Sequence, residues 1–245
     1  MSRFFINKES IDSGFISITG EDYNHIRNVL RYKLGDELIV SDLTGVDFRV
    51  VLSDFGQGKI TARILESFRN STESEVQITL YQALPKSDKM DLIIQKCVEL
   101  GVHRIVPVLT ERIVVKLGQG DADSKITRWR RISFEAAKQC NRGLIPDISV
   151  PVVFDEALKT GTADDLCIIP YEKDKKNKLK NYIQNSKDIK KISVLIGPEG
   201  GFSEEEVEKA IKSGFIPISL GPRILRTETA AIAVVSILMY ELGDI

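Results

Sequence analysis

The stretch ISVLIGPEGGFSEEEVEKAIKSGFIPISLGPRILRTETAA, residues 192–231, decides the fold of this chain. It contains two apolar runs that we expect to form buried strands, Ile192–Ile196 and Ile216–Leu220. Each run leads into a glycine-proline loop, Gly197–Gly201 or Gly221–Arg223, and a predicted helix follows each loop. Ligands of open α/β sheets bind at the carboxyl ends of strands, and glycine allows close approach to the backbone. The two loops therefore predict one small-molecule pocket.

Composition places the chain among ordinary globular proteins and gives it no global attraction to nucleic acid. The 245 residues are 42% hydrophobic and 28% charged, and the net charge is −1. A nucleic-acid site must therefore be a local basic patch. We expect no membrane span, because the longest apolar run, 230–240, falls short of the roughly 20 residues that a spanning helix needs.

The cysteines and histidines favour neither disulfides nor a metal site. The three cysteines, Cys97, Cys140 and Cys167, are odd in number and contain no CxxC pair. With only two histidines in the chain, metal chemistry has few ligands, so no metal is expected. Reduced thiols and the absence of a signal peptide in 1–10 predict a cytoplasmic protein.

The first 70 residues are predicted to form a small β-barrel. Short alternating segments separated by Gly and Asp turns are typical of such barrels. One helix, Asp22–Tyr32, interrupts them, and it places Arg27 and Arg31 four residues apart on one face. That pair indicates either a solvated helix face or a ridge that contacts phosphates. Residues 66–75, ESFRNSTESE, have the polar composition of a linker.

From residue 76 onward the pattern changes to alternating strands and helices. We expect such alternation to give a mostly parallel sheet covered on both faces. The predicted strands and helices, besides those of residues 192–231, are Val76–Leu84, Asp88–Leu100, Arg104–Leu109, Asp123–Gln139 and Leu166–Ile169.

Charged residues mark the starts of two further helices. Ser203 and Glu206 form a capping box, and the acidic turn that they begin disfavours a bound phosphate. Glu228 suits the start of the last helix, Ala230–Leu242, whereas Arg226 opposes its dipole. Such an arginine indicates either pairing with Glu228 or a contact with an anionic substrate. The last helix is apolar on nearly all sides, which predicts burial in the core or in a subunit interface.

Several motifs resemble one family of RNA-modifying enzymes. IGPEGGFSEEE (196–206) and LGPRILRTETAA (220–231) resemble the two signature motifs of the SPOUT RNA methyltransferases. HIRNVLRYKLGDEL (25–38), IIQKCVELGVHRIVPVLTER (93–112) and EAAKQCNRGLIP (135–146) resemble the family that methylates N3 of a uridine in 16S ribosomal RNA, the RsmE family.

This resemblance implies a fold, a cofactor and partners. It implies a PUA-like or OB-like RNA-binding barrel over 1–70 and a SPOUT methyltransferase domain over 71–245. The latter is an α/β domain whose mostly parallel sheet contains a deep trefoil knot. The resemblance further implies S-adenosyl-L-methionine as cofactor, 16S rRNA or the small ribosomal subunit as substrate, and a homodimer formed through the knot domain.

The predicted site combines the resemblance with the chemistry of the reaction. A positioned guanidinium can stabilise negative charge on the uracil carbonyl oxygens. Arg226 is the first candidate for that role, Arg3 the second by similarity to the family's N-terminal arginine, and Glu228 is a candidate proton acceptor. The predicted cofactor residues are Leu84, Glu172, Ile196, Gly197, Pro198, Glu199, Gly200, Leu220, Gly221, Ile224, Leu225 and Thr227. The predicted RNA-binding residues are Arg27, Arg31, Lys33, Lys86, Arg112 and Arg142.

Two alternatives remain beside this interpretation. One is another SPOUT methyltransferase that acts on tRNA or on a ribose 2′-hydroxyl, and the full-length resemblance argues against it. The other is a non-catalytic RNA-binding assembly factor that uses the knot domain to dimerise. The intact glycine loops argue against the second alternative, because a degenerated cofactor site would lose its glycines.

Overall fold

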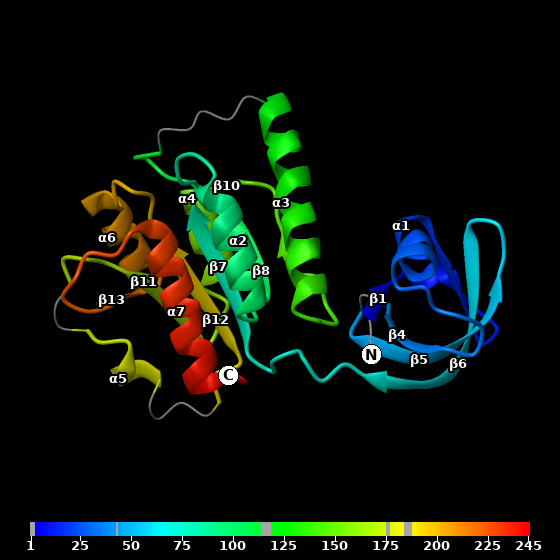
Figure 1. The fold of residues 1–245 in the computed structure, drawn as a ribbon. Coiled ribbons are helices and arrows are strands. Elements are labelled where there is room, and N and C mark those ends of the chain that lie inside the picture. Colours follow the sequence, from blue (N-terminus) through cyan, green and yellow to red (C-terminus); the bar gives the residue numbers. More distant parts are fainter. Residues whose placement is uncertain (1–2, 43, 114–118, 175–176, 184–187) are drawn as a thin grey trace. The chain divides into compact units, whose positions relative to one another are not determined.

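The computed structural model describes residues 3–42, 44–113, 119–174, 177–183 and 188–245. The chain divides into two compact units (Figure 1). Unit 1 comprises residues 1–73 together with 137–145, and unit 2 comprises 74–136 together with 146–245. The predicted functional domains, 1–70 and 71–245, stay a prediction. The return of 137–145 to the first unit is a feature that the sequence pattern did not indicate.

Unit 1 is built on one six-stranded sheet of order β1-β4-β5-β6-β3-β2. Its neighbouring strands are antiparallel except for β1 and β4. Apolar residues at alternate positions of these strands, such as Ile16, Leu38 and Ile60, form a separate core. The elements are β1 (Arg3–Phe5), η1 (Lys8–Ser10), β2 (Ile11–Asp12), β3 (Phe15–Thr19), α1 (Gly20–Asn24), η2 (His25–Val29), β4 (Glu37–Ser41), β5 (Val46–Phe55) and β6 (Lys59–Arg69).

The predicted helix Asp22–Tyr32 is wrong in its extent and regularity. The α-helix ends at Asn24, and a π-helical turn, His25–Val29, continues the chain. Arg31 then adopts the left-handed conformation, with φ at +56°, so it does not continue the helix face on which Arg27 lies. The predicted ridge of two arginines on one helix is therefore not formed.

The predicted linker 66–75 is also wrong in its first half. Residues 66–69 form the end of β6 and pair with β5, because polar residues are tolerated on strands with one solvated face. The next residue, Asn70, is buried and donates to Asp47 at 2.8 Å. Glu73 accepts hydrogen bonds from the backbone N–H groups of Gly143 (2.9 Å) and Leu144 (3.0 Å). These bonds attach 137–145 to unit 1.

Unit 2 contains a seven-stranded sheet in which every neighbouring pair of described strands is parallel. The strand order is β10-β8-β7-β12-β11-β13, and β9 also pairs with β8. The parallel sheet expected from the sequence is thus confirmed. Its strands are β7 (Gln77–Ala83), β8 (Arg104–Leu109), β9 (Asp147–Ile148), β10 (Val152–Val153), β11 (Leu166–Pro170), β12 (Lys191–Ile196) and β13 (Ile216–Ile218).

Helices cover both faces of this sheet, as parallel strands require. The helices α4 and α6 pack on the face that Tyr81 and Leu195 line, and α2 and α7 pack together over the other face (Figure 1). The six helices are α2 (Lys89–Glu99), α3 (Gln119–Gln139), α4 (Phe154–Gly161), α5 (Lys180–Ile183), α6 (Glu204–Lys212) and α7 (Thr227–Leu242).

Three features of unit 2 differ from the sequence prediction. The second motif strand ends at Ile218 rather than at Leu220, and the last helix begins at Thr227 rather than at Ala230. Arg226 is therefore the N-cap residue of α7. Helix α4 was not predicted, although Phe154, Ala157, Leu158 and Gly161 follow the helical period of buried positions.

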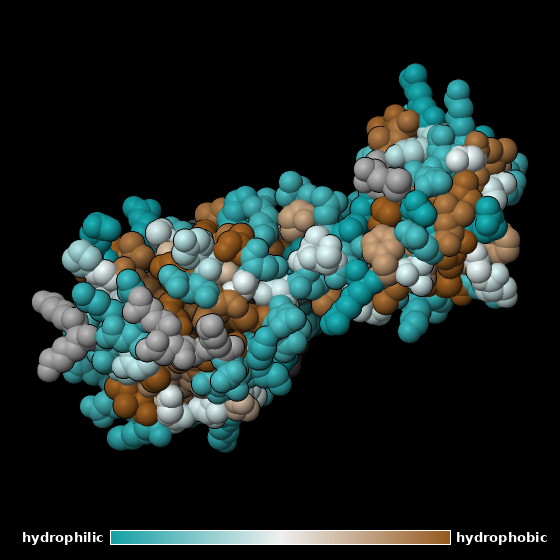
Figure 2. All heavy atoms as spheres, turned by 90° about the horizontal axis from the view of Figure 1, so that it is seen from below, coloured by the Kyte–Doolittle hydropathy of each residue, from teal (hydrophilic) through white to brown (hydrophobic). Residues whose placement is uncertain are grey.

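The last helix is buried on one side only. Val234, Val235 and Leu238 are fully buried, whereas Ile237 is 41% exposed and Tyr240 is 72% exposed. Apolar side chains are visible among hydrophilic ones on the face shown in Figure 2, in both units. No helix in the described part of the chain is long and apolar enough to cross a membrane.

The contact between Gly143 and Asn70 predicts a stability effect in unit 1. A Cβ at Gly143 would lie 2.4 Å from Cγ of Asn70 and 2.6 Å from its Cβ. Because Asn70 is buried and held by Asp47, Gly143→Ala must displace it. We expect the free energy of unfolding to fall by about 1–3 kcal/mol, measured by urea denaturation.

Gly56→Ala is the matched control for this variant. Neither glycine has a positive φ, and a Cβ at Gly56 makes an ordinary contact of 3.5 Å with the carbonyl oxygen of Lys59. This control should leave stability unchanged or raise it by about 0.4–1 kcal/mol. Equal stability of the two variants would contradict the tight packing of 137–145 on unit 1.

Candidate functional site

Three adjacent parallel strands of unit 2 end at one pocket. β12, β11 and β13 are neighbours, and the segments that follow them enclose a cavity of about 540 Å³. This volume lies within the range of small-molecule sites, roughly 300–1,000 Å³. The cavity is lined by Lys89, Pro170, Tyr171, Glu172, Ile196, Gly197, Pro198, Glu199, Gly200, Gly201, Phe202, Ser219, Leu220, Gly221, Pro222, Arg223, Ile224, Leu225, Arg226, Thr227 and Ala230.

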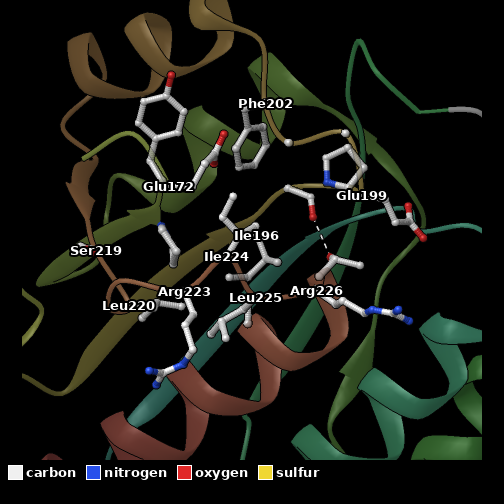
Figure 3. A pocket seen from close by; sticks show the side chains of 18 of the residues that line it. Glu172, Ile196, Glu199, Phe202, Ser219, Leu220, Arg223, Ile224, Leu225 and Arg226 are labelled. Atoms are coloured by element: carbon white, nitrogen blue, oxygen red, sulfur yellow. Dashed lines mark hydrogen bonds between the residues drawn. The ribbon is translucent and has the colours of Figure 1, made fainter. Parts of the chain in front are cut away.

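A buried hydroxyl group joins the two glycine-proline loops. Thr227 Oγ1 donates to the carbonyl oxygen of Gly197 at 2.6 Å, shown as a dashed line in Figure 3. It also accepts a hydrogen bond from Nε2 of Gln82 at 3.0 Å. Gln82 is fully buried and Thr227 is 5% exposed, so water does not compete for these bonds. One side chain thus fixes the second loop against the first and against β7.

The loop backbones leave room and donors for a ligand. Gly221 has φ at +114°, a conformation that L side chains rarely adopt, and a Cβ there would meet nothing within 4 Å. Among the described residues, the backbone N–H groups of Ile224 and Leu225 have no hydrogen-bond acceptor. These donors suit neutral acceptors such as the ring nitrogens of a nucleobase. Ile196, Ile224 and Leu225 lie close together in the pocket, as Figure 3 shows.

The capping box predicted at α6 is confirmed, and it also joins the start of α6 to the segment after β8. Ser203 Oγ accepts from the backbone N–H of Glu206 at 3.2 Å, and Glu206 accepts from the backbone N–H of Ser203 at 2.9 Å. The second carboxylate oxygen of Glu206 accepts from the backbone N–H of Glu111 at 2.8 Å. Of the three acidic residues in the first turn of α6, Glu206 is therefore bound within the protein.

An ion cluster lies at the start of α2. Nζ of Lys89 is 3.0 Å from Oε1 of Glu199 and 3.3 Å from Oε2 of Glu228. The carboxylate of Glu199 also accepts from the backbone N–H of Lys86 at 3.1 Å. The predicted alternative in which Glu228 pairs with Arg226 is therefore not formed; Lys89 is the partner.

The ion cluster changes two pKa values in opposite directions. The pKa of Lys89 is raised above its ordinary value, chiefly because Lys89 donates to Glu199, with Glu228 contributing. Burial acts to raise the pKa of Glu199, but hydrogen bonds from its own backbone, Lys89 and Lys86 outweigh burial and lower it. A carboxyl group with a lowered pKa stabilises the fold when the pH is above the pKa of that group in the unfolded chain. An amine with a raised pKa stabilises the fold when the pH is below its pKa in the unfolded chain. Both groups are therefore charged between these limits, which include neutral pH.

Arg226 has a different environment from these residues. Its side chain is exposed, and no described residue forms a hydrogen bond or ion pair with its guanidinium. In Figure 3 the side chains of Arg226 and Glu199 extend towards the same edge of the pocket. An unpaired guanidinium at a pocket edge can donate to an incoming carbonyl or anionic group.

The structure brings most of the predicted cofactor residues to this one pocket. Leu84 is the exception among the predicted cofactor residues. It is 3% exposed, is buried after β7 and does not line the cavity. Glu172 lies beside Gly201, with 3.6 Å between Oε1 and the Cβ position of that glycine. The lining residues that the predicted site did not include are Lys89, Pro170, Tyr171, Gly201, Phe202, Ser219, Pro222, Arg223 and Ala230. The end of β11 was visible as a strand and could have indicated Tyr171.

The predicted RNA-binding residues of unit 2 lie near the first loop. Arg112 Nη1 donates to the carbonyl oxygen of Gly200 at 3.0 Å, and Lys86 is exposed beside Glu199. A track for RNA through these residues stays a prediction.

In unit 1, some predicted residues are exposed and others are held internally. Arg27 donates to the hydroxyl of Tyr23 and lies over its ring, and Arg31 and Lys33 are exposed. Arg142 is 5% exposed and pairs with Glu73 at 2.7 Å, so contact with RNA would require this pair to open.

Arg3 is bound within unit 1 as well. Its guanidinium donates to the buried carboxylate of Asp47 at 2.8 Å and to the carbonyl oxygen of Asn141. Its predicted catalytic role stays a prediction, and it would require these bonds to exchange. In the described part of the chain, no group of three or more His, Cys, Asp or Glu residues is arranged to hold a metal ion.

Family models match both parts of the chain. An RNA methyltransferase domain model matches residues 72–239, and an RNA methyltransferase PUA domain model matches residues 18–65. The chain is 34% identical to the ribosomal RNA small subunit methyltransferase E of Bacillus subtilis, over 98% of this chain and 97% of that protein. The chain belongs to the RNA methyltransferase family.

Solved structures agree with this membership over the full length. The ribosomal RNA small subunit methyltransferase E of Neisseria gonorrhoeae, bound to S-adenosyl methionine, is 30% identical with a TM-score of 0.86, covering 100% of this chain and 99% of that one. A putative methyltransferase of Legionella pneumophila, in complex with bound SAM, is 32% identical with a TM-score of 0.85, covering 99% and 98%. The α/β fold and the PUA-like N-terminal part are those of the family.

The buried hydroxyl of Thr227 predicts a stability effect. Thr227→Val keeps the shape but leaves Gln82 Nε2 and the carbonyl oxygen of Gly197 each without one partner. We expect a loss of about 1–3 kcal/mol in the free energy of unfolding, measured by chemical denaturation.

Thr229→Val is the control on the same helix. Thr229 is exposed, and no hydrogen bond of its side chain is found among the described residues. This variant should stay within about 0.5 kcal/mol of the original protein. If Thr227→Val were equally neutral, the hydroxyl would not be what joins the loops.

Proposed function

We propose that this protein methylates N3 of a uridine in 16S ribosomal RNA of the small subunit, with S-adenosyl-L-methionine as the methyl donor. The observation that carries the proposal is the pocket at the ends of β12, β11 and β13, with the unpaired guanidinium of Arg226 at its edge. Near full-length similarity to ribosomal RNA small subunit methyltransferases E supports the substrate class.

The residues of the pocket fit the proposed cofactor. The free N–H groups of Ile224 and Leu225 suit adenine, and the apolar side chain of Ile196 suits its ring. The exposed carboxylate of Glu172 is available for the ammonium group of the methionine part. When bound, the cofactor supplies a methyl group made electrophilic by the sulfonium. The acidic start of α6 favours such a cationic ligand over a phosphate.

Two groups of the chain have proposed roles in the reaction. As the N3–H bond of uracil breaks and the N3–CH₃ bond forms, negative charge spreads onto the carbonyl oxygens of the base. Arg226 donates to one of these oxygens and stabilises that charge. Glu228 is the proposed acceptor of the N3 proton, since its carboxylate lies two residues after Arg226 at the start of α7 and pairs with Lys89 of the pocket.

Basic residues of each unit are proposed to contact the RNA substrate. The PUA match over 18–65 supports RNA binding by unit 1, where Arg27, Arg31 and Lys33 are exposed. Arg3 is proposed as a second catalytic cation by similarity to the family's N-terminal arginine. A uridine in a loop or single strand suits the site, because a paired base would have to be extruded.

The assembly is proposed to be a homodimer through the knot domain. The partly exposed apolar residues Ile237 and Tyr240 of α7 and the 84% exposed Ile224 support an apolar contact there. The deep trefoil knot is proposed from the resemblance of the two signature motifs to SPOUT enzymes, and the cytoplasmic location from the three free cysteines.

Arg226→Ala tests the catalytic proposal. The variant should keep its fold and bind S-adenosyl-L-methionine with a Kd close to that of the original protein, about 1 μM or −8 kcal/mol. It should lose roughly 10²–10³-fold in the rate of methyl transfer, because a charge-stabilising donor is removed. Calorimetry measures the binding, and transfer of a labelled methyl group to 16S rRNA measures the rate.

Arg104→Ala is the matched control. Arg104 begins β8 at the other end of the parallel strands and pairs with Asp147. This variant should transfer methyl groups at the original rate. Unimpaired methyl transfer by Arg226→Ala would refute the role of Arg226. Failure of the original protein to bind S-adenosyl-L-methionine would refute the proposed function.

A further inference from the structure

Lys89 connects the two cofactor loops at a second point. It lies at the first position of α2 and lines the pocket, although it belongs to neither loop. Its ammonium is 3.0 Å from Glu199 of the first loop and 3.3 Å from Glu228, which follows the second loop on α7. One cation thus links three segments that are far apart in sequence.

We propose that Lys89 is a positioning residue that joins the two loops at the edge of the pocket, so that both loops hold the cofactor in one fixed geometry. This inference rests on the proposed function. Thr227 joins the same loops through buried hydrogen bonds, and Lys89 adds an ionic connection on the side where Glu199 and Arg226 extend (Figure 3).

The surroundings of the cluster make it more than a surface ion pair. The side chains of Lys89 and Glu199 are 28% and 27% exposed, and that of Glu228 is 14% exposed. Partly buried charges are screened less by salt than exposed ones, and two carboxylates share the one cation. Removal of Lys89 would leave both carboxylates uncompensated at the edge of the pocket.

The connection before α2 is held in an unusual conformation next to this cluster. Ser87 has φ at +57°, and the backbone N–H of Lys86 donates to both carboxylate oxygens of Glu199, at 3.1 and 3.3 Å. A non-glycine residue persists in the left-handed region where its surroundings over-determine it. Glu199 therefore fixes the loop that delivers Lys89, and Lys89 in turn fixes Glu199.

Calorimetric binding of S-adenosyl-L-methionine to the full-length protein tests this role. Lys89→Met should weaken binding about tenfold at a temperature well below its thermal midpoint. Lys89→Arg should restore affinity to within about threefold, because the charge is kept. Lys96→Met is the control. Lys96 lies on the same helix and does not line the pocket, and its Nζ is 2.9 Å from Oε1 of Glu99. This control should bind as the original protein does.

A double-mutant cycle separates the ion pair from a general packing effect. Glu199→Gln keeps an acceptor for the N–H of Lys86 but loses the charge, so it should also weaken binding. The double variant Lys89→Met/Glu199→Gln should bind the cofactor no more weakly than the more impaired single variant, because both substitutions remove the same interaction. Should the methionine variant fail to fold, Lys89→Gln in the same cycle replaces it.

The outcomes distinguish this inference from the proposed function. If the original protein and Lys89→Met bind the cofactor equally well, the role of Lys89 is overturned and the proposed function is not. Fully additive losses in the cycle would also overturn that role. Original protein that does not bind S-adenosyl-L-methionine would overturn the proposed function and this inference together.

Discussion

The hydrogen bonds of the Thr227 hydroxyl are the constraint on which the site depends. Glycine-rich loops are flexible by themselves, and each of the two loops follows a different strand of the sheet. Thr227 fixes one loop to the carbonyl oxygen of Gly197 in the other and to the buried amide of Gln82 on β7. Because these groups are excluded from water, the connection is costly to break, and the pocket keeps its shape.

The position of Thr227 also accounts for the exposed charges of the site. As the first residue of α7, it places Arg226 at the N-cap and Glu228 one residue further along the helix. Lys89 compensates Glu228 and Glu199, so neither carboxylate is paired with Arg226. A guanidinium at a helix N-terminus is unfavourable in the dipole field, and its retention at the pocket edge is consistent with a role towards the substrate. The energetic cost of Arg226 thus lies at the pocket edge, where the proposed reaction would use a cation.

Local patterns in the sequence were enough to predict the sheet and the pocket. The apolar run before Gly197 gave the strand, the glycine-proline loops marked the ligand site, and Ser203 with Glu206 formed the predicted cap. Lys89 was missed because its role depends on two carboxylates more than 100 residues away in the chain, and no spacing rule connects them. Leu84 does not line the cavity, since a residue at a strand end can point into the core as easily as towards a ligand.

The errors in unit 1 have a similar physical origin. The polar composition of 66–75 suggested a linker, but Glu73 and Thr72 use their polar groups to hold 137–145. A polar segment that satisfies buried hydrogen-bond donors cannot be distinguished by composition from one that is solvated. The turn at Arg31 was missed for a related reason, because the left-handed conformation of a non-glycine residue depends on its surroundings.

These two loops are proposed to support methylation of a uridine base. The most direct test of this proposal is mass spectrometry of nucleosides from 16S rRNA that has been incubated with the protein and isotope-labelled S-adenosyl-L-methionine. Unmodified RNA, as free rRNA and as assembled small subunits, serves as substrate, and the Arg226→Ala protein serves as the control. The account predicts label in N3-methyluridine and in no other nucleoside. Label on a ribose, or on a base other than uracil, would contradict it.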